Sequence, residues 1–374
     1  MTADPFIPLV RLENETVWDT LEPALRELVT AGRFVLGPEL EEFERAAARA
    51  FGCSWAVGTS SGTSALYLAL RAAPLPVPAW VALPANTFYA TFEAVVAAGH
   101  VPVVVDHDDD HLISVDALEQ VDVDAVVAVH LYGLPAVTER LGDLVRRRGW
   151  WLLEDASQSH GATAGGRPAG SLGDAAAFSA YPTKNLGAWG DAGFITGNDP
   201  GMEAELRSLR DHGQRQRHLH EAVAGPHRLD NLQALVLTEK LRRLPDEVRA
   251  RRRVASWYHE ALDGLGLDLP GDRGDRTHVY HRFVVPVPDR DAVRRRLAEA
   301  GVGTGVDYPT PVHLQPGARN LCEVPRPPRN AETSAGRVLS LPMHAQLTPA
   351  EVDRVADALR SALAARRPTR LSTA

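Results

Sequence analysis

The sequence has little lysine and little cysteine, no excess of positive charge and no long apolar run. Only Lys184 and Lys240 are lysines, so few side chains can form an imine with a carbonyl group. The two cysteines, Cys53 and Cys322, cannot form a CxxC metal or redox site and fit a reduced protein with inert thiols. A net charge of −8 argues against a general nucleic-acid-binding surface.

Signals for export and membrane insertion are also missing. Residues 1–12 carry acidic and proline residues early, without the basic start and apolar stretch of a signal peptide. No apolar run approaches the roughly 18 residues that suggest a membrane span. We therefore expect a soluble, cytoplasmic protein with no metal, nucleic-acid or membrane partner.

Short β-type segments alternate with helical patterns after two N-terminal helices, expected at 16–31 and 39–50. This alternation predicts an α/β fold whose mainly parallel sheet is flanked by helices. The expected strands are 101–106, 125–130, 150–155, 175–180 and 193–196, and the expected helices between them are 63–72, 87–98, 137–148 and 203–213.

The last third of the chain follows another pattern. It predicts, in order, a long helix over 228–262, a β segment over 278–286, a helix over 290–300, an irregular stretch over 308–328, a helix over 349–365 and a frayed tail over 366–374. The basic cluster 249–253 is interpreted as a solvated helix face paired with Glu247 and Glu260 rather than as a phosphate site. We expect a large domain, 1–250, and a smaller C-terminal α/β domain, 251–374.

A loop of small residues opens into a helix at Gly58–Leu66, with the sequence GTSSGTSAL. Free backbone N–H groups and the positive end of a helix dipole favour a phosphate at such a place, and the hydroxyls of Ser61 or Thr63 can add hydrogen bonds. The same residue types also serve as ordinary helix caps, so the loop alone leaves both interpretations open.

An acidic residue ends the apolar segment Leu152-Leu153-Glu154-Asp155. Open α/β sheets bind ligands at the carboxyl ends of their strands, where a carboxylate can hold the protonated nitrogen of a pyridine ring. A helix-capping or loop aspartate is the alternative interpretation.

Lys184 lies in FSAYPTKNLG, an otherwise lysine-free and mostly uncharged stretch. A lysine in a dry pocket loses its proton more easily, as imine formation requires. Solvation at the surface is the alternative, which the surrounding proline, glycine and small residues disfavour.

The run FSAYPTKNLGAWGDAGF resembles the lysine motif of the DegT/StrS family of sugar aminotransferases. These enzymes depend on pyridoxal 5′-phosphate (PLP) and have the type I fold of aspartate aminotransferase. The resemblance extends from about Gly37 to Pro342. Other segments resemble the remaining family blocks, in the family's order: LPANTFYAT, VHLYGLPA, EDASQSHGA, GSLGDAAAFS, RLDNLQA and YPTPVHLQP.

The resemblance implies a role for each matching residue. Lys184 would bind the cofactor covalently and move the proton, and Asp155 would pair with the pyridinium nitrogen. Phe88 could equally be an ordinary core residue, and Ser179 a strand hydroxyl. The other implied cofactor contacts are Gln158 at the phenolic oxygen, Phe88 on the ring, and Ser61, Gly62, Thr63 and Ser179 at the phosphate.

The resemblance also implies the reaction and its partners. L-Glutamate would give its amino group and leave as 2-oxoglutarate, and a keto group at C3 or C4 of a nucleotide-linked deoxysugar, dTDP-linked by preference, would receive it. Tyr308 and His313 would lie near the sugar nucleotide, although His313 could be a packed loop histidine. Relatives are homodimers with shared active sites, and they make amino sugars for antibiotics, other glycosides or surface polysaccharides.

One block departs from the family pattern. Relatives have Gly-x-Asn-x ahead of RLDxLQ, with the asparagine on the cofactor phosphate of the neighbouring subunit, whereas this chain has Pro226 there. His227 or Arg228 could replace that contact, or the phosphate is held less tightly.

Two rival functions remain: a sugar dehydratase of the same fold, and a catalytically idle regulatory or binding protein. In the dehydratases a histidine replaces the lysine, and Lys184 is intact.

Overall fold

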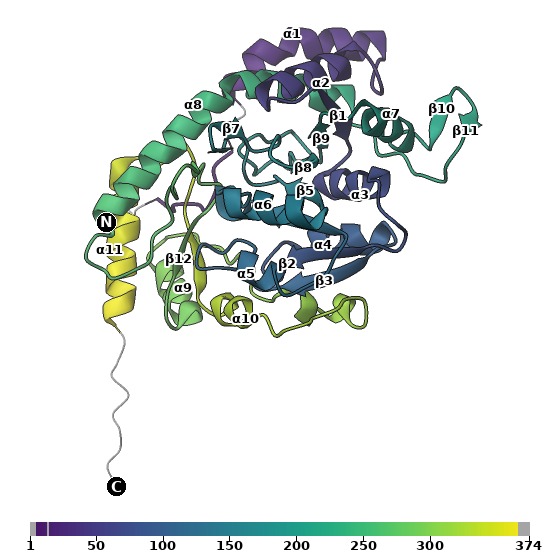
Figure 1. The fold of residues 1–374 in the computed structure, drawn as a ribbon. Coiled ribbons are helices and arrows are strands. Elements are labelled where there is room, and N and C mark those ends of the chain that lie inside the picture. Colours follow the sequence, from purple (N-terminus) through teal and green to yellow (C-terminus); the bar gives the residue numbers. More distant parts are fainter. Residues whose placement is uncertain (1–4, 13–14, 366–374) are drawn as a thin grey trace.

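The computed structural model describes residues 5–12 and 15–365 (Figure 1). The two expected N-terminal helices are α1 (Glu15–Ala31) and α2 (Pro38–Ala50), and both pack on the long helix α8 (Asn231–Ala261). The expected frayed tail, 366–374, lies outside the described residues.

A seven-stranded sheet forms the centre of the larger part of the molecule, in the order β1-β9-β8-β5-β4-β2-β3. Neighbouring strands are parallel except at β9, which is antiparallel to both β1 and β8. The expected mainly parallel sheet is therefore confirmed. The strands are β1 (Trp55–Thr59), β2 (Trp80–Pro84), β3 (Val101–Val105), β4 (Ala125–Val129), β5 (Trp151–Asp155), β8 (Ala175–Ser179) and β9 (Gly193–Gly197).

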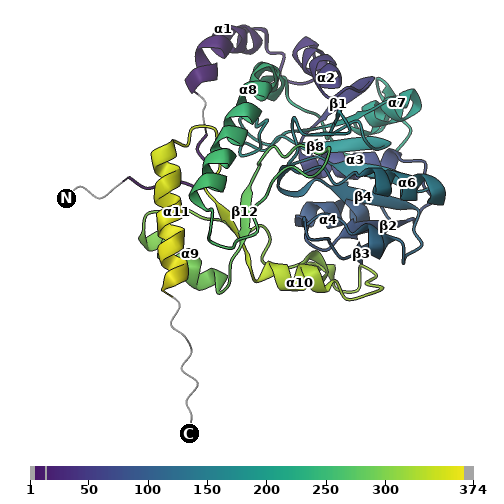
Figure 2. The ribbon, with the colours of Figure 1, turned by 60° about the vertical axis from the view of Figure 1, so that its left-hand side comes forward.

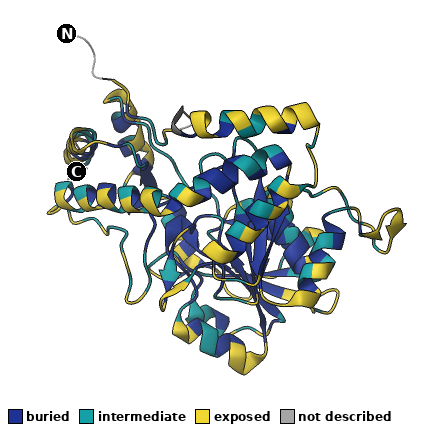
Figure 3. Ribbon diagram, turned by 90° about the horizontal axis from the view of Figure 1, so that it is seen from above, coloured by how far each residue is buried: buried dark blue, intermediate teal, exposed yellow. Residues whose placement is uncertain are grey.

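Helices cover this sheet, and Figure 3 shows its strands as buried ribbons beneath partly exposed helices. The strands are runs of valine, alanine and leucine because both of their faces are buried. The covering helices are α3 (Gly62–Ala72), α4 (Tyr89–Ala97), α5 (Val115–Leu118), α6 (Glu139–Arg148) and α7 (Pro200–Leu209).

The sequence pattern missed two strands of the sheet, β1 and β2. Strand β1 contains Gly58 in its interior, which weakens its β signal. Strand β2 directly follows the proline-rich stretch 74–78, which favours a loop. Both strands are fixed by pairing with neighbours remote in sequence, β9 for β1 and β3 and β4 for β2.

A second hydrophobic core lies in the smaller part of the molecule. Its strands β12 (Phe283–Pro286) and β13 (Val338–Leu341) are antiparallel and pack with α9 (Arg290–Glu299), α11 (Pro349–Ala364) and the C-terminal half of α8. Figure 2 shows α11 alongside α8. Ile7 belongs to this core, and its N–H donates to Gly301 O at 2.9 Å.

The N-terminal segment, expected within the large domain, thus packs against the smaller part. The division expected at 250/251 falls inside α8, which contributes to both cores. It stays a prediction.

The basic cluster 249–253 differs from the expected solvated face at Arg251. This side chain is buried, pairs with Glu247 at 2.8 Å, and donates to the carbonyl oxygens of Tyr280 and Met343. It therefore ties α8 to the segments around the smaller core.

The remaining elements are short. Within the described residues no helix is both long and apolar enough to cross a bilayer, and no group of three or more potential metal ligands gathers. The short elements are β6 (Thr163–Ala164), β7 (Arg167–Pro168), β10 (Gln214–Gln216), β11 (Leu219–His220), α10 (Arg329–Ala335) and the 3-10 turns η1 (Leu131–Gly133), η2 (Val312–Leu314) and η3 (Pro316–Ala318).

Candidate active site

A cavity of about 420 Å³ lies at the carboxyl ends of β4, β5 and β8 and at the first turn of α3. Parallel strands place the residues that follow them at one edge of the sheet, which explains why segments remote in sequence meet here. Nine of the ten predicted site residues line this cavity: Ser61, Gly62, Thr63, Phe88, Asp155, Gln158, Ser179, Lys184 and Tyr308.

The first turn of α3 forms one wall of the cavity. Ser61 caps the helix, because its hydroxyl accepts the N–H of Ser64 at 3.0 Å. A Cβ added to Gly62 would lie 2.5 Å from Cβ of Ser179, so only glycine lets the helix approach the end of β8 this closely. The first N–H groups of a helix have no partner within it, so they and the helix dipole offer a site for a phosphate.

Asp155 ends β5 and is buried. Its Oδ2 accepts the hydroxyl of Thr91 at 2.8 Å, and its Oδ1 accepts the N–H of Ser157 at 3.2 Å. The second bond is the local turn that the capping interpretation expects. The first comes from α4 and holds the carboxylate in a fixed orientation at the cavity, where it can pair with a cationic ring nitrogen.

Lys184 follows β8 and reaches the same cavity. Burial lowers the pKa of its amine from 10.5 to about 8. Of the charges nearby, Asp155 raises this pKa, Arg282 lowers it and Asp307 raises it, in decreasing order of effect. The neutral amine needed for imine formation is therefore accessible near neutral pH.

Two buried histidines, His160 and His281, interact with the charge of Lys184. Burial is the main cause that lowers the pKa of His160 to about 3, and the charge of Lys184 lowers it further. The pKa of His281 also lies well below its usual value, chiefly because of burial. Both rings are therefore neutral at physiological pH and add no positive charge beside the lysine.

Gln158 and the aromatic rings of Phe88 and Tyr308 also line the cavity. The amide oxygen of Gln158 accepts the N–H of Tyr132 at 2.7 Å, and its nitrogen donates to the Tyr308 hydroxyl at 3.1 Å. The rings of Phe88 and Tyr308 lie 5.7 Å apart, and Phe88 is 56% exposed. The exposed Phe88 is therefore no ordinary core residue and can stack on a bound ring.

His313 is the one predicted site residue outside this cavity. Its Nε2 lies 3.2 Å from a carboxylate oxygen of Glu332. Its contact with a sugar stays a prediction, and the loop-histidine alternative agrees with this pairing.

The family asparagine is replaced by Pro226 here, and the structure shows where the two possible substitutes, His227 and Arg228, lie. Within this chain Nδ1 of His227 lies 3.2 Å from the hydroxyl of Ser64, on the first turn of α3. Arg228 pairs with Asp211 at 2.8 Å. Of the two candidates, His227 thus lies beside the helix end suited to a phosphate.

Sequence reasoning missed four polar residues at or beside the cavity. Thr91 and Asp191 lie within segments that resemble family blocks, but the resemblance assigned no role to either residue. Arg282 and Asp307 lie outside the quoted blocks. Asp307 directly precedes the predicted Tyr308, which was the only local signal available.

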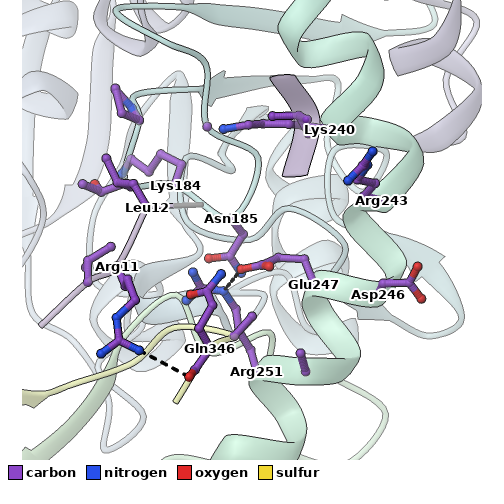
Figure 4. Close-up of a pocket in the computed structure, with 17 residues that line it drawn as sticks. Arg11, Leu12, Lys184, Asn185, Lys240, Arg243, Asp246, Glu247, Arg251 and Gln346 are labelled. Carbon is purple, nitrogen blue, oxygen red and sulfur yellow. Dashed lines mark hydrogen bonds and ion pairs between the residues drawn. The ribbon is translucent and has the colours of Figure 1, made fainter. Parts of the chain in front are cut away.

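A second cavity, of about 600 Å³, is also lined by Lys184 (Figure 4). It lies between the Lys184 loop, α8 and the N-terminal segment, and Lys240, Glu247 and Arg251 line it. Neither Asp155 nor the first turn of α3 lines it. It therefore lacks the groups that would hold a phosphate and a ring nitrogen, although it is the larger cavity.

The groups that line the 420 Å³ cavity fit a phosphorylated pyridine aldehyde. A helix end suits the phosphate, Asp155 suits the ring nitrogen, Gln158 can reach a phenolic oxygen, and the Lys184 amine suits the aldehyde. Such a set is hard to reconcile with a nicotinamide cofactor or a metal.

Comparison with known proteins gives a concordant result. The model of the DegT/DnrJ/EryC1/StrS aminotransferase family matches residues 18–360. A protein of Acidithiobacillus ferrooxidans named UDP-N-acetyl-3-dehydro-alpha-D-glucosamine 3-aminotransferase is 37% identical over 373 residues, which are 97% of this chain and 100% of that protein. A dTDP-3-amino-3,4,6-trideoxy-alpha-D-glucose transaminase of Streptomyces venezuelae is 38% identical over 361 residues, 95% of each chain.

Solved structures resemble the whole chain as well. The crystal structure of S. venezuelae DesV in complex with a ketimine intermediate has a TM-score of 0.90 to this structure at 38% identity. The match covers 97% of this chain and 100% of DesV. The likeness therefore includes both the larger and the smaller part of the molecule.

Proposed function

Because this chain belongs to the DegT/DnrJ/EryC1/StrS family of nucleotide-sugar aminotransferases, we propose that it transfers an amino group from L-glutamate to a keto group at C3 or C4 of a nucleotide-linked deoxysugar. The family is PLP-dependent. We propose dTDP as the nucleotide, with UDP as the alternative that one relative's name supports. The names of both relatives place the amino group at C3, which favours the C3 ketone.

A single observation carries the proposal. Lys184, with its lowered pKa, lines the same cavity as Asp155 and the first turn of α3. A surface lysine, a helix-capping aspartate or an ordinary helix cap would each explain one of these features. None of them explains why all three converge on one cavity.

The side chains divide the work between binding and proton movement. Bound PLP supplies an electron sink that lets a proton leave the carbon bearing the transferred nitrogen. Lys184 would remove that proton as a general base and deliver it, as a general acid, to the cofactor's aldehyde carbon, and it would carry out the reverse transfer in the other half of the reaction. Asp155, held by Thr91, would keep the ring nitrogen protonated, and the first turn of α3 would hold the phosphate.

We further propose a homodimer in which both subunits complete each active site. Phe88 and Tyr181 line the cavity yet are 56% and 50% exposed, and Phe34, Val35 and Leu36 form an exposed apolar run. Large apolar side chains grouped on the surface of one chain commonly mark an interface. Equilibrium sedimentation would test the dimer.

The proposed reaction is tested with a panel of dTDP- and UDP-linked 3-keto and 4-keto sugars. Each is incubated with the PLP-loaded protein and L-glutamate, and 2-oxoglutarate release is measured. We expect release with at least one keto sugar and none with K184A. Activity with simple keto acids alone would contradict the sugar assignment and leave the aminotransferase class intact.

A further inference from the structure

Arg282 is the only arginine among the described residues that line the cofactor cavity. It directly precedes β12, so it reaches the cavity from the smaller part of the molecule. Its side chain is 13% exposed. The guanidinium is thus a permanent positive charge that bulk water solvates poorly.

Asp307 holds one edge of this guanidinium. Nε of Arg282 donates to Oδ2 of Asp307 at 3.1 Å, and the same oxygen accepts the Ser340 hydroxyl at 2.8 Å. Nη1 donates to the carbonyl oxygen of His281 at 3.4 Å. Nη2 has no hydrogen-bond partner among the described residues, although a guanidinium presents five donors.

Apart from Lys184, Arg282 is the one positively charged side chain among the described residues that line the cavity, so it is the main group that can bind an anion near Lys184. Asp155, Asp191 and Asp307 repel anions, and Lys184 is neutral when it acts as a base. The charge of Arg282 lowers the pKa of Lys184 and outweighs the opposite effect of Asp307. Arg282 and Lys184 also line the same cavity, so the arginine shares the space in which the proton would move.

We propose that Arg282 binds the α-carboxylate of the amino-acid donor, and of the 2-oxo acid that leaves, through its free guanidinium edge. The α-carboxylate is one bond away from the carbon whose proton Lys184 moves, which places it near Arg282. The diphosphate of a sugar nucleotide is separated from its reacting carbon by most of a sugar ring, so it suits this position less well.

Asp307 explains how one site accepts two different substrates. A keto sugar carries no carboxylate next to its ketone, so an arginine without a partner would be left buried and uncompensated in that half of the reaction. The ion pair with Asp307 remains in both halves. Only the free edge of Arg282 gains or loses a partner.

The inference rests on the proposed function. Its test compares the substitution of Arg282 with the removal of the negative charge from the α-carboxylate of L-glutamate. R282Q is expected to raise the KM for L-glutamate on the order of 100-fold, the scale expected when one partner of a desolvated charge pair is removed. In the original protein, the KM for the α-methyl ester of L-glutamate should be higher than that for L-glutamate by a similar factor. In R282Q, the ester should have nearly the same KM as L-glutamate, because the substitution and the esterification remove the same contact.

The matched control is R276Q. Arg276 pairs with Asp110 at 3.3 Å and is 12% exposed, close to the burial of Arg282, but it does not line the cavity. R276Q should leave the KM for L-glutamate within about threefold of the original value if it folds. Circular dichroism and PLP absorbance establish that both variants are folded and loaded.

A binding readout separates recognition from catalysis. Borohydride fixes PLP to Lys184, and calorimetry then measures 2-oxoglutarate binding without turnover. R282Q should weaken binding on the order of 100-fold. D307N should leave it equal or tighter, because Arg282 loses a competing anion. Weaker binding in D307N than in R282Q would overturn the proposal.

The two proposals fail in different ways. If R282Q raises the KM for the keto sugar as much as that for L-glutamate, or changes neither, the role of Arg282 is wrong while the reaction stands. If the protein converts L-glutamate to 2-oxoglutarate stoichiometrically but accepts no keto sugar, the proposed function is wrong. The ester comparison still tests Arg282 in that case.

Discussion

The two sides of the cofactor cavity are built in different ways. The side formed by the larger part consists of a helix end, at Gly62, and of residues at or beyond the carboxyl ends of parallel strands, such as Asp155 and Lys184. The side formed by the smaller part consists of Arg282, on a segment leading into β12, and Asp307, on an irregular segment. The first side is set by local geometry and is the one proposed to bind the cofactor, whereas the second depends on how the smaller part packs.

This difference suggests a division of labour. Changes on the cofactor side should lower kcat or release PLP for every substrate. Changes on the other side should raise the KM for one substrate and spare the other. The predictions below test that division, from the largest effect to the smallest.

The largest effect is expected for K184A. Among the described residues that line the cavity, Lys184 alone carries an amine, so its removal should lower turnover by roughly 10⁴-fold or more, because both the attachment and the proton transfer are lost. PLP should remain bound, held by the other contacts, but should wash out on dialysis. The measurement is 2-oxoglutarate release, with K240A as the control for the other lysine. Comparable losses in both variants would contradict the assignment.

A smaller but still large effect is expected for D155N. The amide keeps the shape and removes the negative charge that holds the proton on the ring nitrogen, so kcat should fall roughly 100-fold or more. T91V, which removes only the hydroxyl bonded to Asp155, should cost about tenfold or less. Steady-state kinetics with both substrates would show a change in kcat at nearly constant KM. A pure KM effect would place Asp155 on the substrate side.

G62A tests the wall that faces the phosphate. The new methyl group would collide with Ser179, so α3 must shift and PLP affinity should fall about tenfold or more. G142A is the matched control, because Gly142 in α6 has nothing within 4 Å of an added Cβ. That change should stabilise the protein by up to about 1 kcal/mol. Fluorescence titration with PLP measures the affinity of both variants, and thermal unfolding measures their stability. Equal PLP affinities in G62A and G142A would contradict the role of the α3 wall in holding the phosphate.

The pH dependence of PLP attachment tests the environment of Lys184. The reactive form is the neutral amine, so the rate at which cofactor-free protein binds PLP covalently should rise with pH and level off above about 8. In D155N the midpoint should shift to lower pH, since Asp155 raises this pKa. In R282Q it should shift to higher pH. Stopped-flow absorbance gives the midpoint, and a value near 10.5 would show a solvated lysine.

The smallest effects concern the predicted sugar contacts. Y308F removes a hydroxyl that faces the cavity and bonds Gln158, so the KM for the keto sugar should rise about tenfold. H313A should change it less than threefold if the histidine acts only through Glu332. Kinetics with the accepted sugar nucleotide decide the order. A larger loss in H313A would restore His313 as a substrate contact.

The meeting of Asp155 and Lys184 at one cavity could be expected from the sequence. Parallel strands end at one edge, which placed Asp155 there, and the resemblance to the family placed Lys184 beside it without knowledge of their contacts. Thr91 was invisible, because a threonine inside a helix carries no sign of the carboxylate it will meet. Strands β1 and β2 were missed because their partners, not their own residues, stabilise them.

The substrate side could not be predicted to the same extent. Arg282 lies in a segment that reads simply as a β strand, and Asp307 owes its position to Arg282 and Ser340, both remote in the chain. The segment 5–12 joins the smaller core for the same kind of reason, through backbone bonds of Ile7 to Gly301 and Gly303. Pairings of this kind follow from tertiary structure, and the amino-acid pattern alone does not reveal them.

The most direct test of the central claim uses the scarcity of lysine. The PLP-loaded protein is reduced with borohydride, digested and mapped by mass spectrometry, and the two lysine-containing peptides are compared. The account predicts that the reduced cofactor is found on Lys184 and absent from Lys240. A cofactor fixed to Lys240, or to neither lysine in folded and PLP-supplemented protein, would contradict it.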